Sequence, residues 1–265
     1  MLDSWNHKTF GTTISSVLSE HSELVGNYHE EDRRLMEEHL NSSPYQSLKP
    51  NRLHNAYAKL KEEILTPILS NTRTRVWHYT RLTDYEVDSM RQQPVLSSLN
   101  HLKDRLEKLV ANELLTLEES EMVYSESPFH LQHEIRANRL WTTNIPLAPS
   151  DSGVMPLLES WGGESAYFWL KNESISTKLK SIGSARIVEM ETSLSDNLNG
   201  YSVSDTVLKA WARNLGVPLQ VSGCDLPITN CIDTMKVVRV HTKGESSFEA
   251  IATSYPQDAG SLLGE

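Results

Sequence analysis

The stretch from Arg75 to Leu82, which reads Arg-Val-Trp-His-Tyr-Thr-Arg-Leu, constrains the fold more than any other part of the chain. Its apolar start, Val76 and Trp77, has high strand propensity, and a histidine, an aromatic residue and a hydroxyl residue follow. The pattern predicts a short buried strand with a polar end. Because strand ends hold polar groups rigidly against ligands, His78 is a candidate functional residue. The alternative is a hydrogen-bonded core histidine with no part in chemistry.

A second informative stretch begins at the paired glycines Gly162 and Gly163 and continues through Ala166-Tyr167-Phe168-Trp169. Paired glycines allow positive φ or the close approach of a ligand to the backbone. The aromatic run has the composition of a core strand. We therefore expect a ligand-contacting turn that leads into a second strand. The alternative is a plain tight turn before a core strand.

The remaining pattern predicts an α+β fold, with a mixed or antiparallel sheet flanked by helices. Helices are expected through most of residues 1–70, over 99–112, after the caps Thr83 and Thr116, and over 205–215. Strands are expected over 185–191, 219–221, 226–228 and 236–241, residues 246–253 suit either a helix or a strand, and residues 125–152 form a long irregular connection. We divide the chain into a helical N-terminal extension (1–70), a main domain (71–255) and a tail (256–265).

Composition excludes several classes of protein. With 265 residues, 38% of them apolar, the chain is able to bury a sizeable core. It has no long apolar run and no secretory-signal pattern at the N-terminus, so we expect a cytoplasmic protein without a membrane partner. Cys224 and Cys231 have the spacing of neither a metal clamp nor a disulfide framework, and no metal is expected. A net charge of −10 argues against a protein that coats nucleic acid, so nucleic acid would need a local basic cleft.

Taken together, the His78 strand and the Gly162–Tyr167 stretch resemble the ADP-ribosyltransferase family. The resemblance is to its histidine-type branch, which includes bacterial toxins of the DarT kind. In that branch a first strand reads roughly Tyr-His-any-Thr, a form that Trp77-His78-Tyr79-Thr80 matches. A later strand supplies an aromatic residue that stacks on nicotinamide, and Tyr167 holds the matching position. The resemblance covers about residues 73–245, and it implies a split β-sheet core and NAD as co-substrate.

The resemblance also implies a set of site residues. His78 and Thr80 would bind the ribose hydroxyls and the nicotinamide amide, Tyr167 would stack on the ring, and arginines would pair with the pyrophosphate. The implied cofactor-binding residues are His78, Tyr79, Thr80, Arg81, Gly163, Tyr167, Arg136 and Arg139. If the arginines bind no phosphate, they are ordinary surface residues.

Cleavage of the nicotinamide–ribose bond also needs a carboxylate near the developing positive charge. The family has a glutamate at the start of a late strand, whereas this chain has Asp225 at the position that we match. The shorter aspartate weakens or redirects that charge. Glu249 and Glu245 are the next candidates, and Glu189 and Glu191 in an expected middle strand compete with them.

The implied activity is transfer of ADP-ribose to RNA or DNA by a bacterial toxin or phage-defence effector. Two alternatives stay open: a transferase that modifies protein, and a non-catalytic binding module that kept the fold and lost the carboxylate. A 2′-phosphotransferase is disfavoured because convergent arginines and histidines are sparse. The N-terminal helices and residues 112–152 are the expected places for shaping the acceptor site or docking an antitoxin or chaperone.

Overall fold

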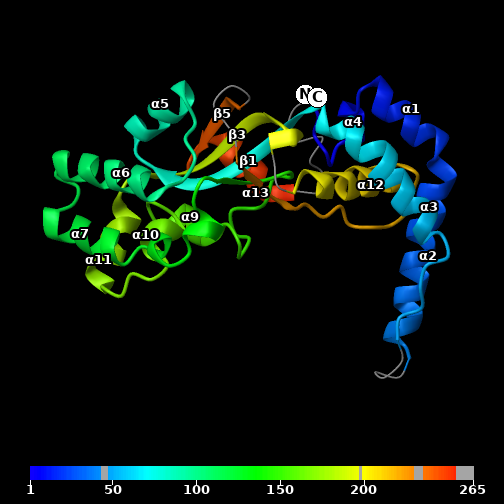
Figure 1. Ribbon diagram of the computed structural model, residues 1–265, viewed down its shortest axis with the longest axis horizontal. Helices are drawn as coiled ribbons and strands as arrows, with labels where there is room; N and C mark the ends of the chain where they lie inside the picture. The colour runs from blue at the N-terminus through cyan, green and yellow to red at the C-terminus, as the bar shows by residue number, and fades with distance from the viewer. Residues whose placement is uncertain (43–46, 197–198, 230–234, 255–265) are drawn as a thin grey trace.

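The structure is a computed structural model that describes residues 1–42, 47–196, 199–229 and 235–254. Within these residues, five antiparallel strands form one sheet in the order β4-β2-β1-β3-β5 (Figure 1). The strands are β1 (Arg73–Leu82), β2 (Leu140–Thr143), β3 (Ser184–Ser193), β4 (Asp225–Ile228) and β5 (Lys236–Thr242). The predicted α+β fold with an antiparallel sheet is confirmed. Among the described residues the strands make one continuous sheet, not the split pair that the resemblance implies.

The central strand is β1, because it pairs with β2 on one side and with β3 along its whole length on the other. The β1–β3 ladder runs from Arg73 opposite Ser193 to Leu82 opposite Ser184. Val76 and Trp77, the apolar start recognised in the sequence, are fully buried. The stretch with the strongest strand signal thus forms the middle of the sheet.

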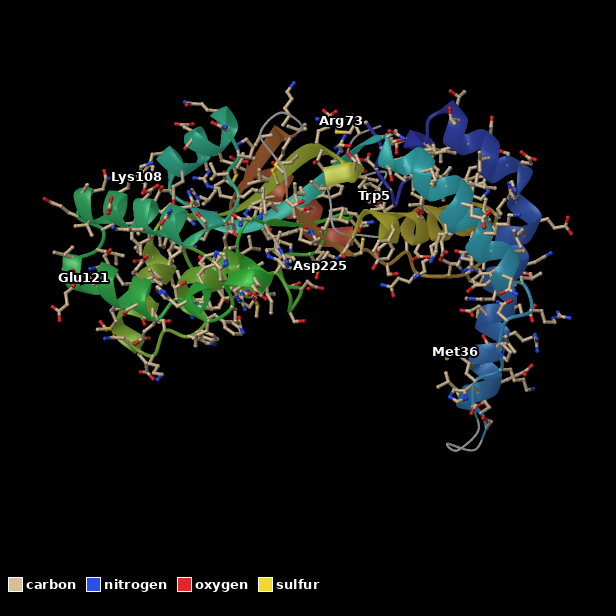
Figure 2. All side chains as sticks on the ribbon, viewed as in Figure 1. Trp5, Met36, Arg73, Lys108, Glu121 and Asp225 are labelled. Carbon is tan, nitrogen blue, oxygen red and sulfur yellow. The ribbon has the colours of Figure 1, made fainter. Side chains whose placement is uncertain are left out.

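The N-terminal helices lie at one end of the molecule (Figure 1). They are η1 (His7–Thr9), α1 (Thr12–Glu20), α2 (Ser22–Leu40) and a run of α3 (His54–Lys59), the π-helix η2 (Leu60–Leu65) and α4 (Thr66–Ser70). Helix α12 (Val203–Asn214) packs against α2 and α4. The first residues also join the sheet, because the Leu2 N–H donates to the Arg73 carbonyl at 2.9 Å and the Trp5 ring lies 6.4 Å from the Trp77 ring. Figure 2 labels Trp5 and Arg73. The predicted N-terminal extension therefore shares its hydrophobic core with the sheet.

At the other end, a group of helices has a hydrophobic cluster of its own (Figure 1). Its elements are α6 (Leu99–Ala111), α7 (Leu117–Ser125), η3 (Pro128–His130), α8 (His133–Arg136), α10 (Glu164–Tyr167) and α11 (Glu173–Ser181). The buried residues of this cluster include Leu102, Leu106, Leu109, Val123, Phe129, Trp161 and Leu179. Two neighbouring helices, α5 (Asp84–Gln92) and α9 (Met155–Glu159), connect this group to the strands.

Two predicted helix starts are confirmed in detail. Thr116 caps α7 with a capping box, because its hydroxyl accepts from the Glu119 N–H and the Glu119 carboxylate accepts from the Thr116 N–H. Thr83 begins α5 with the same arrangement, with the Glu86 carboxylate 2.8 Å from the Thr83 backbone nitrogen. Residues 246–253, which suited either class, lie in helix α13 (Ser246–Ser254).

Two predicted strands are wrong. Gly162 and Gly163 have φ of 81° and 58°, and the Tyr167 N–H donates to the Gly163 carbonyl, so the aromatic run begins in helix α10. Helix α10 contacts η3 and α7, and its Ala166 is buried in the helical cluster, which overrides the strand propensity of the aromatic residues. Residues 219–221 have no strand partner in the described chain. The short 3-10 helices η4 (Leu194–Asp196) and η5 (Gly200–Ser202) complete the fold, while Cys231 and the tail lie outside the described residues.

Candidate functional site

His78 lies on β1 and is held by one hydrogen bond. Its Nδ1 lies 2.8 Å from the Trp141 carbonyl oxygen, and since a carbonyl only accepts, Nδ1 carries the proton. Burial lowers the pKa of His78 to about 4, and the nearby Arg105 guanidinium adds to the effect. The ring is therefore neutral at physiological pH, with Nε2 as a hydrogen-bond acceptor.

We expect the His78 ring to stay neutral at pH 6 and to take up a proton near pH 4. In the unfolded chain, a histidine titrates at about pH 6.5. The neutral native ring therefore contributes stability above that pH, and the contribution is lost as the pH falls toward 4. An NMR titration of the imidazole signals, assigned with His78→Gln, measures this directly. Titration of His78 near its ordinary value would contradict the expectation.

A buried polar cluster consists of Glu86, Thr83, Arg105 and Trp161, hereafter the Glu86 cluster, and the charge of its Arg105 acts on the pKa of His78. The Glu86 carboxylate accepts from the Arg105 Nε at 2.7 Å and from the Trp161 indole at 2.9 Å. Burial alone would raise the pKa of Glu86, but Arg105 and the hydrogen bonds lower it below its usual range. Arg105 also stacks on the Trp161 ring at 4.4 Å, and its Nη2 is buried without a hydrogen-bond partner.

Sequence reasoning missed the Glu86 cluster. Its members come from the start of α5, the middle of α6 and the residue before Gly162, and each one alone has the pattern of an ordinary helix or turn residue. The available signal was the capping-box glutamate at the third position of α5, but a cap does not reveal that the same carboxylate binds an arginine and a tryptophan.

Three of the predicted cofactor-binding residues, Gly163, Tyr167 and Arg136, lie together in the structure. The Arg136 guanidinium forms an ion pair with Glu164, the residue that follows Gly163, and lies 5.1 Å from the centre of the Phe168 ring. Burial and the Glu164 charge raise the pKa of Tyr167 to about 12, so the phenol stays neutral. Trp161, in the Glu86 cluster, directly precedes Gly162, which connects this group to the Glu86 cluster.

Arg139 is linked to His78 through Trp141. Its guanidinium lies 6.0 Å from the centre of the Trp141 ring, and its Nη2 donates to the Glu134 carbonyl at 3.0 Å. Trp141 is the residue whose carbonyl holds the His78 ring. Arg139 therefore lies next to Trp141, the residue that orients the His78 ring.

Tyr79 and Arg81 bind backbone groups on the opposite face of the sheet. Successive residues of a strand face opposite sides, so Thr80 shares the face of His78, and Tyr79 and Arg81 do not. The Tyr79 hydroxyl donates to the Leu147 carbonyl at 3.1 Å, and Arg81 donates to the carbonyls of Ile182 and Gly183 at 2.8 and 2.9 Å. These two side chains hold connecting segments against the sheet, and Thr80 is buried.

The structure places Asp225 on the far face of the sheet from His78. Trp77 stands opposite Thr143 on β2, and Thr143 stands opposite Asp225 on β4. Directly opposed residues project to the same face, so Asp225 shares the face of Trp77, which His78 does not. Asp225 is exposed, and it lies between the helical group and the N-terminal helices (Figure 2).

The other predicted carboxylates also lie away from His78. Glu245 follows β5, two strands from β1, and a hydrogen bond from the Thr242 N–H lowers its pKa. Glu249 is exposed on α13. Glu189 and Glu191, on the face of Trp77, pair with Arg75 at 2.7 Å and with Arg73 at 2.9 Å.

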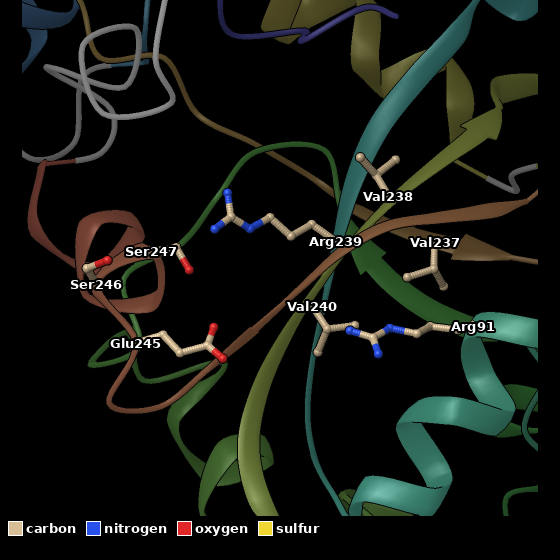
Figure 3. A pocket seen from close by; sticks show the side chains of 8 residues that line it. All are labelled: Arg91, Val237, Val238, Arg239, Val240, Glu245, Ser246 and Ser247. Carbon is tan, nitrogen blue, oxygen red and sulfur yellow. The ribbon is translucent and has the colours of Figure 1, made fainter.

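Two cavities add to this description. One of about 770 Å³ lies along β5 and is lined by Arg91, residues 237–240 and the start of α13 (Figure 3). The other, of about 280 Å³, lies between α2, α3 and α12, where the stacked rings of Tyr28 and Tyr57 are 3.7 Å apart and His29 bonds the Tyr57 hydroxyl. Burial raises the pKa of Cys224 in this second cavity to about 12, so its thiol is a poor nucleophile.

The described part of the chain has no group of three or more histidine, cysteine or carboxylate side chains placed to share a metal ion. It also has no helix whose length and apolarity would let it span a bilayer. Comparison of this chain with known protein families, with curated proteins and with solved structures finds no match.

Proposed function

We propose that the protein is an NAD-dependent ADP-ribosyltransferase that modifies nucleic acid, with its reactive site at His78. The observation that carries the proposal is the state of this histidine: a neutral ring, oriented by the Trp141 carbonyl, with Nε2 left as an acceptor. An ADP-ribosyltransferase-type fold is part of the proposal. The resemblance of the β1 sequence to toxins of the DarT kind supports both the activity and the nucleic-acid acceptor.

The residues that we assign to the site suit a dinucleotide. His78 Nε2 would accept a hydrogen bond from a ribose hydroxyl, and Tyr167 offers a flat face to a nicotinamide ring. Arg136 would exchange its Glu164 partner for the pyrophosphate, which a guanidinium binds well. Arg105, whose charge acts on the pKa of His78, has a further donor in its unpartnered Nη2. NAD supplies the ADP-ribosyl group, and its nicotinamide–ribose bond breaks with the electron pair on nicotinamide.

Glu164 is our choice for the carboxylate of this site. Glu164 pairs with Arg136, and its charge raises the pKa of Tyr167. By contrast, Asp225 lies on β4, Glu245 follows β5 and Glu249 lies on α13. Once Arg136 turns to the pyrophosphate, the Glu164 carboxylate is free to stabilise positive charge on the ribose and to accept the proton that the acceptor group loses.

A second candidate function is a module that binds NAD without turning it over. The observation in its favour is the location of Asp225, Glu245 and Glu249, none of which shares the surroundings of His78. The two candidates differ in a single readout, the fate of the ADP-ribose group.

The test is incubation of the purified protein with labelled NAD and, in parallel, DNA, RNA and cell-lysate protein. We expect label on DNA or RNA, and a loss of at least about 100-fold in His78→Ala and in Glu164→Gln. Glu121→Gln, an exposed change on α7, is the matched control and should keep full activity (Figure 2).

Each other outcome has a defined meaning. Label on protein alone would keep the transferase and replace its acceptor. NAD binding by calorimetry without transfer of label would select the binding module. Neither binding nor transfer would overturn both functions and leave His78 as a core histidine.

A further inference from the structure

Strand β5 lies at the edge of the sheet. It follows β3 at the end of the strand order, and within the described residues its other side has no strand partner. An edge strand presents a row of backbone N–H and C=O groups that are ready to pair with another strand. Proteins use such edges to bind extended peptides, which gain affinity from the backbone and specificity from alternate side chains.

The large cavity runs along this free edge and has two walls. Four consecutive residues, 237–240, line it, together with Arg91 of α5 and residues 245–247 at the start of α13. Figure 3 shows Arg239 directed toward Ser247 on the α13 side, while Val237 and Val240 lie toward Arg91. The register agrees, because Val237 and Val240 stand opposite Met190 and Val188, which share one face of β3. A strand added at this edge would find a side-chain wall on each face.

The side chains along the edge determine which kind of peptide strand binds there. Val238 is 44% exposed, so the edge offers apolar surface. Lys236, Arg239 and Lys243 are exposed along the same strand and its end, with Arg91 across the groove. This basic strip belongs to a chain with a net charge of −10. Its charge is complementary to an acidic segment with apolar residues between the acids.

We infer that β5 binds an extended acidic segment of a partner protein as a sixth strand of the sheet. A second copy of the chain is a poor occupant, because antiparallel β5–β5 pairing would set the basic side chains of the two strands against one another. Nucleic acid is also disfavoured, because valines and Glu245 line the groove and phosphates have no use for unpaired backbone carbonyls. The inference does not depend on the transferase activity.

Protection against aggregation is the alternative role for the basic residues of β5, and the experiment must distinguish it from peptide binding. Lysines on an edge strand also protect a protein from edge-to-edge aggregation, and a purely protective strip would bind no peptide. The decisive probe is a fluorescein-labelled ten-residue peptide of alternating glutamate and valine, titrated with the full chain and followed by fluorescence anisotropy. Its lysine–valine counterpart and a version N-methylated at every second residue are the comparison peptides.

We expect saturable binding of the acidic peptide, at least about tenfold weaker binding of the lysine peptide, and loss of binding on N-methylation, which removes backbone donors. Arg239→Glu should weaken binding at least about tenfold, because it reverses one charge of the groove. Lys108→Glu, an exposed change on α6 far from β5 (Figure 2), should leave binding unchanged. Circular dichroism of both variants confirms that they are folded.

Several results would overturn the inference. These are no binding of the acidic peptide, equal binding of the two charge types, and equal affinity of the N-methylated peptide. Tighter binding of single-stranded DNA than of the acidic peptide, lost in Arg239→Glu, would assign the strip to nucleic acid. A stable dimer in light scattering that Arg239→Glu dissociates would assign the edge to a second copy.

Discussion

Replacing Glu86 with glutamine is expected to lower the free energy of unfolding by about 3–5 kcal/mol. Glu86 is buried, and its carboxylate accepts hydrogen bonds from Thr83, Arg105 and Trp161. The glutamine amide has one acceptor oxygen and no charge, so it leaves the largely buried guanidinium of Arg105 without its counter-ion. Urea denaturation of the variant and the natural sequence measures the difference.

The control for this prediction is Glu107→Gln, which removes an exposed glutamate that pairs loosely with Lys103 on the same helix. Its effect should stay within about 0.5 kcal/mol. The two proteins should also differ in acid. The native pKa of Glu86 is lowered, so its contribution is present above the unfolded pKa and is lost as the pH falls through the folded value. Glu86→Gln should therefore show a shallower loss of stability on the acid side. A loss below about 1 kcal/mol at neutral pH would contradict the assigned role.

Gly183→Ala is expected to cost about 2–5 kcal/mol, for two reasons that add. Gly183 has φ of +67°, where an L-residue is strained. An added Cβ would also lie 2.4 Å from the carbonyl carbon and oxygen of Leu82, which are backbone atoms in the paired end of β1. The backbone must therefore shift where β1 meets β3, and thermal or urea unfolding should report the cost.

Gly216→Ala separates the two reasons. Gly216 follows the C-terminal cap of α12 with φ of +94°, and an added Cβ there would meet no atom of the described residues within 4 Å. Only the backbone strain remains, so we expect a cost of about 1–2 kcal/mol. Equal costs at Gly183 and Gly216 would show that the close approach to Leu82 does not matter.

The parts of the fold that sequence could predict are those with local causes. The β-rich apolar start of β1, the capping boxes at Thr83 and Thr116 and the helical spacing of α6 each act over a few residues, and each prediction is confirmed. Strand β2 was not predicted, because its four residues have too short a pattern and become a strand only through pairing with β1 and β4. The aromatic run after Gly163 fails as a strand for the converse reason, since tertiary contacts with the helical group outweigh its local preference.

The site depends on strand register and helix packing, which no short stretch of the sequence specifies. His78 was singled out as the polar end of a short strand, but β1 continues to Leu82, so His78 lies inside the strand and that part of the prediction is wrong. The choice of Asp225 required the register of β4, and a shift of one residue moves every side chain to the other face. The group of Gly163, Arg136 and Tyr167 is brought together by the packing of α8 and α10, which no local pattern specifies.

The helical group that separates β1 from β3 bears on the order in which the chain folds. Leu82 and Ser184 are partners, yet about 100 residues lie between them, and closing so long a loop slows the pairing of two strands. Residues 97–139 form a shorter segment that closes on itself, because the Ser97 N–H donates to the Arg139 carbonyl at 2.9 Å and the Asn138 N–H to the Ser97 carbonyl at 2.7 Å. Once its helices assemble, they bring the end of β1 and the start of β2 into reach of each other. The rate at which the sheet is completed should then depend on Ser97, a residue that belongs to none of the five strands.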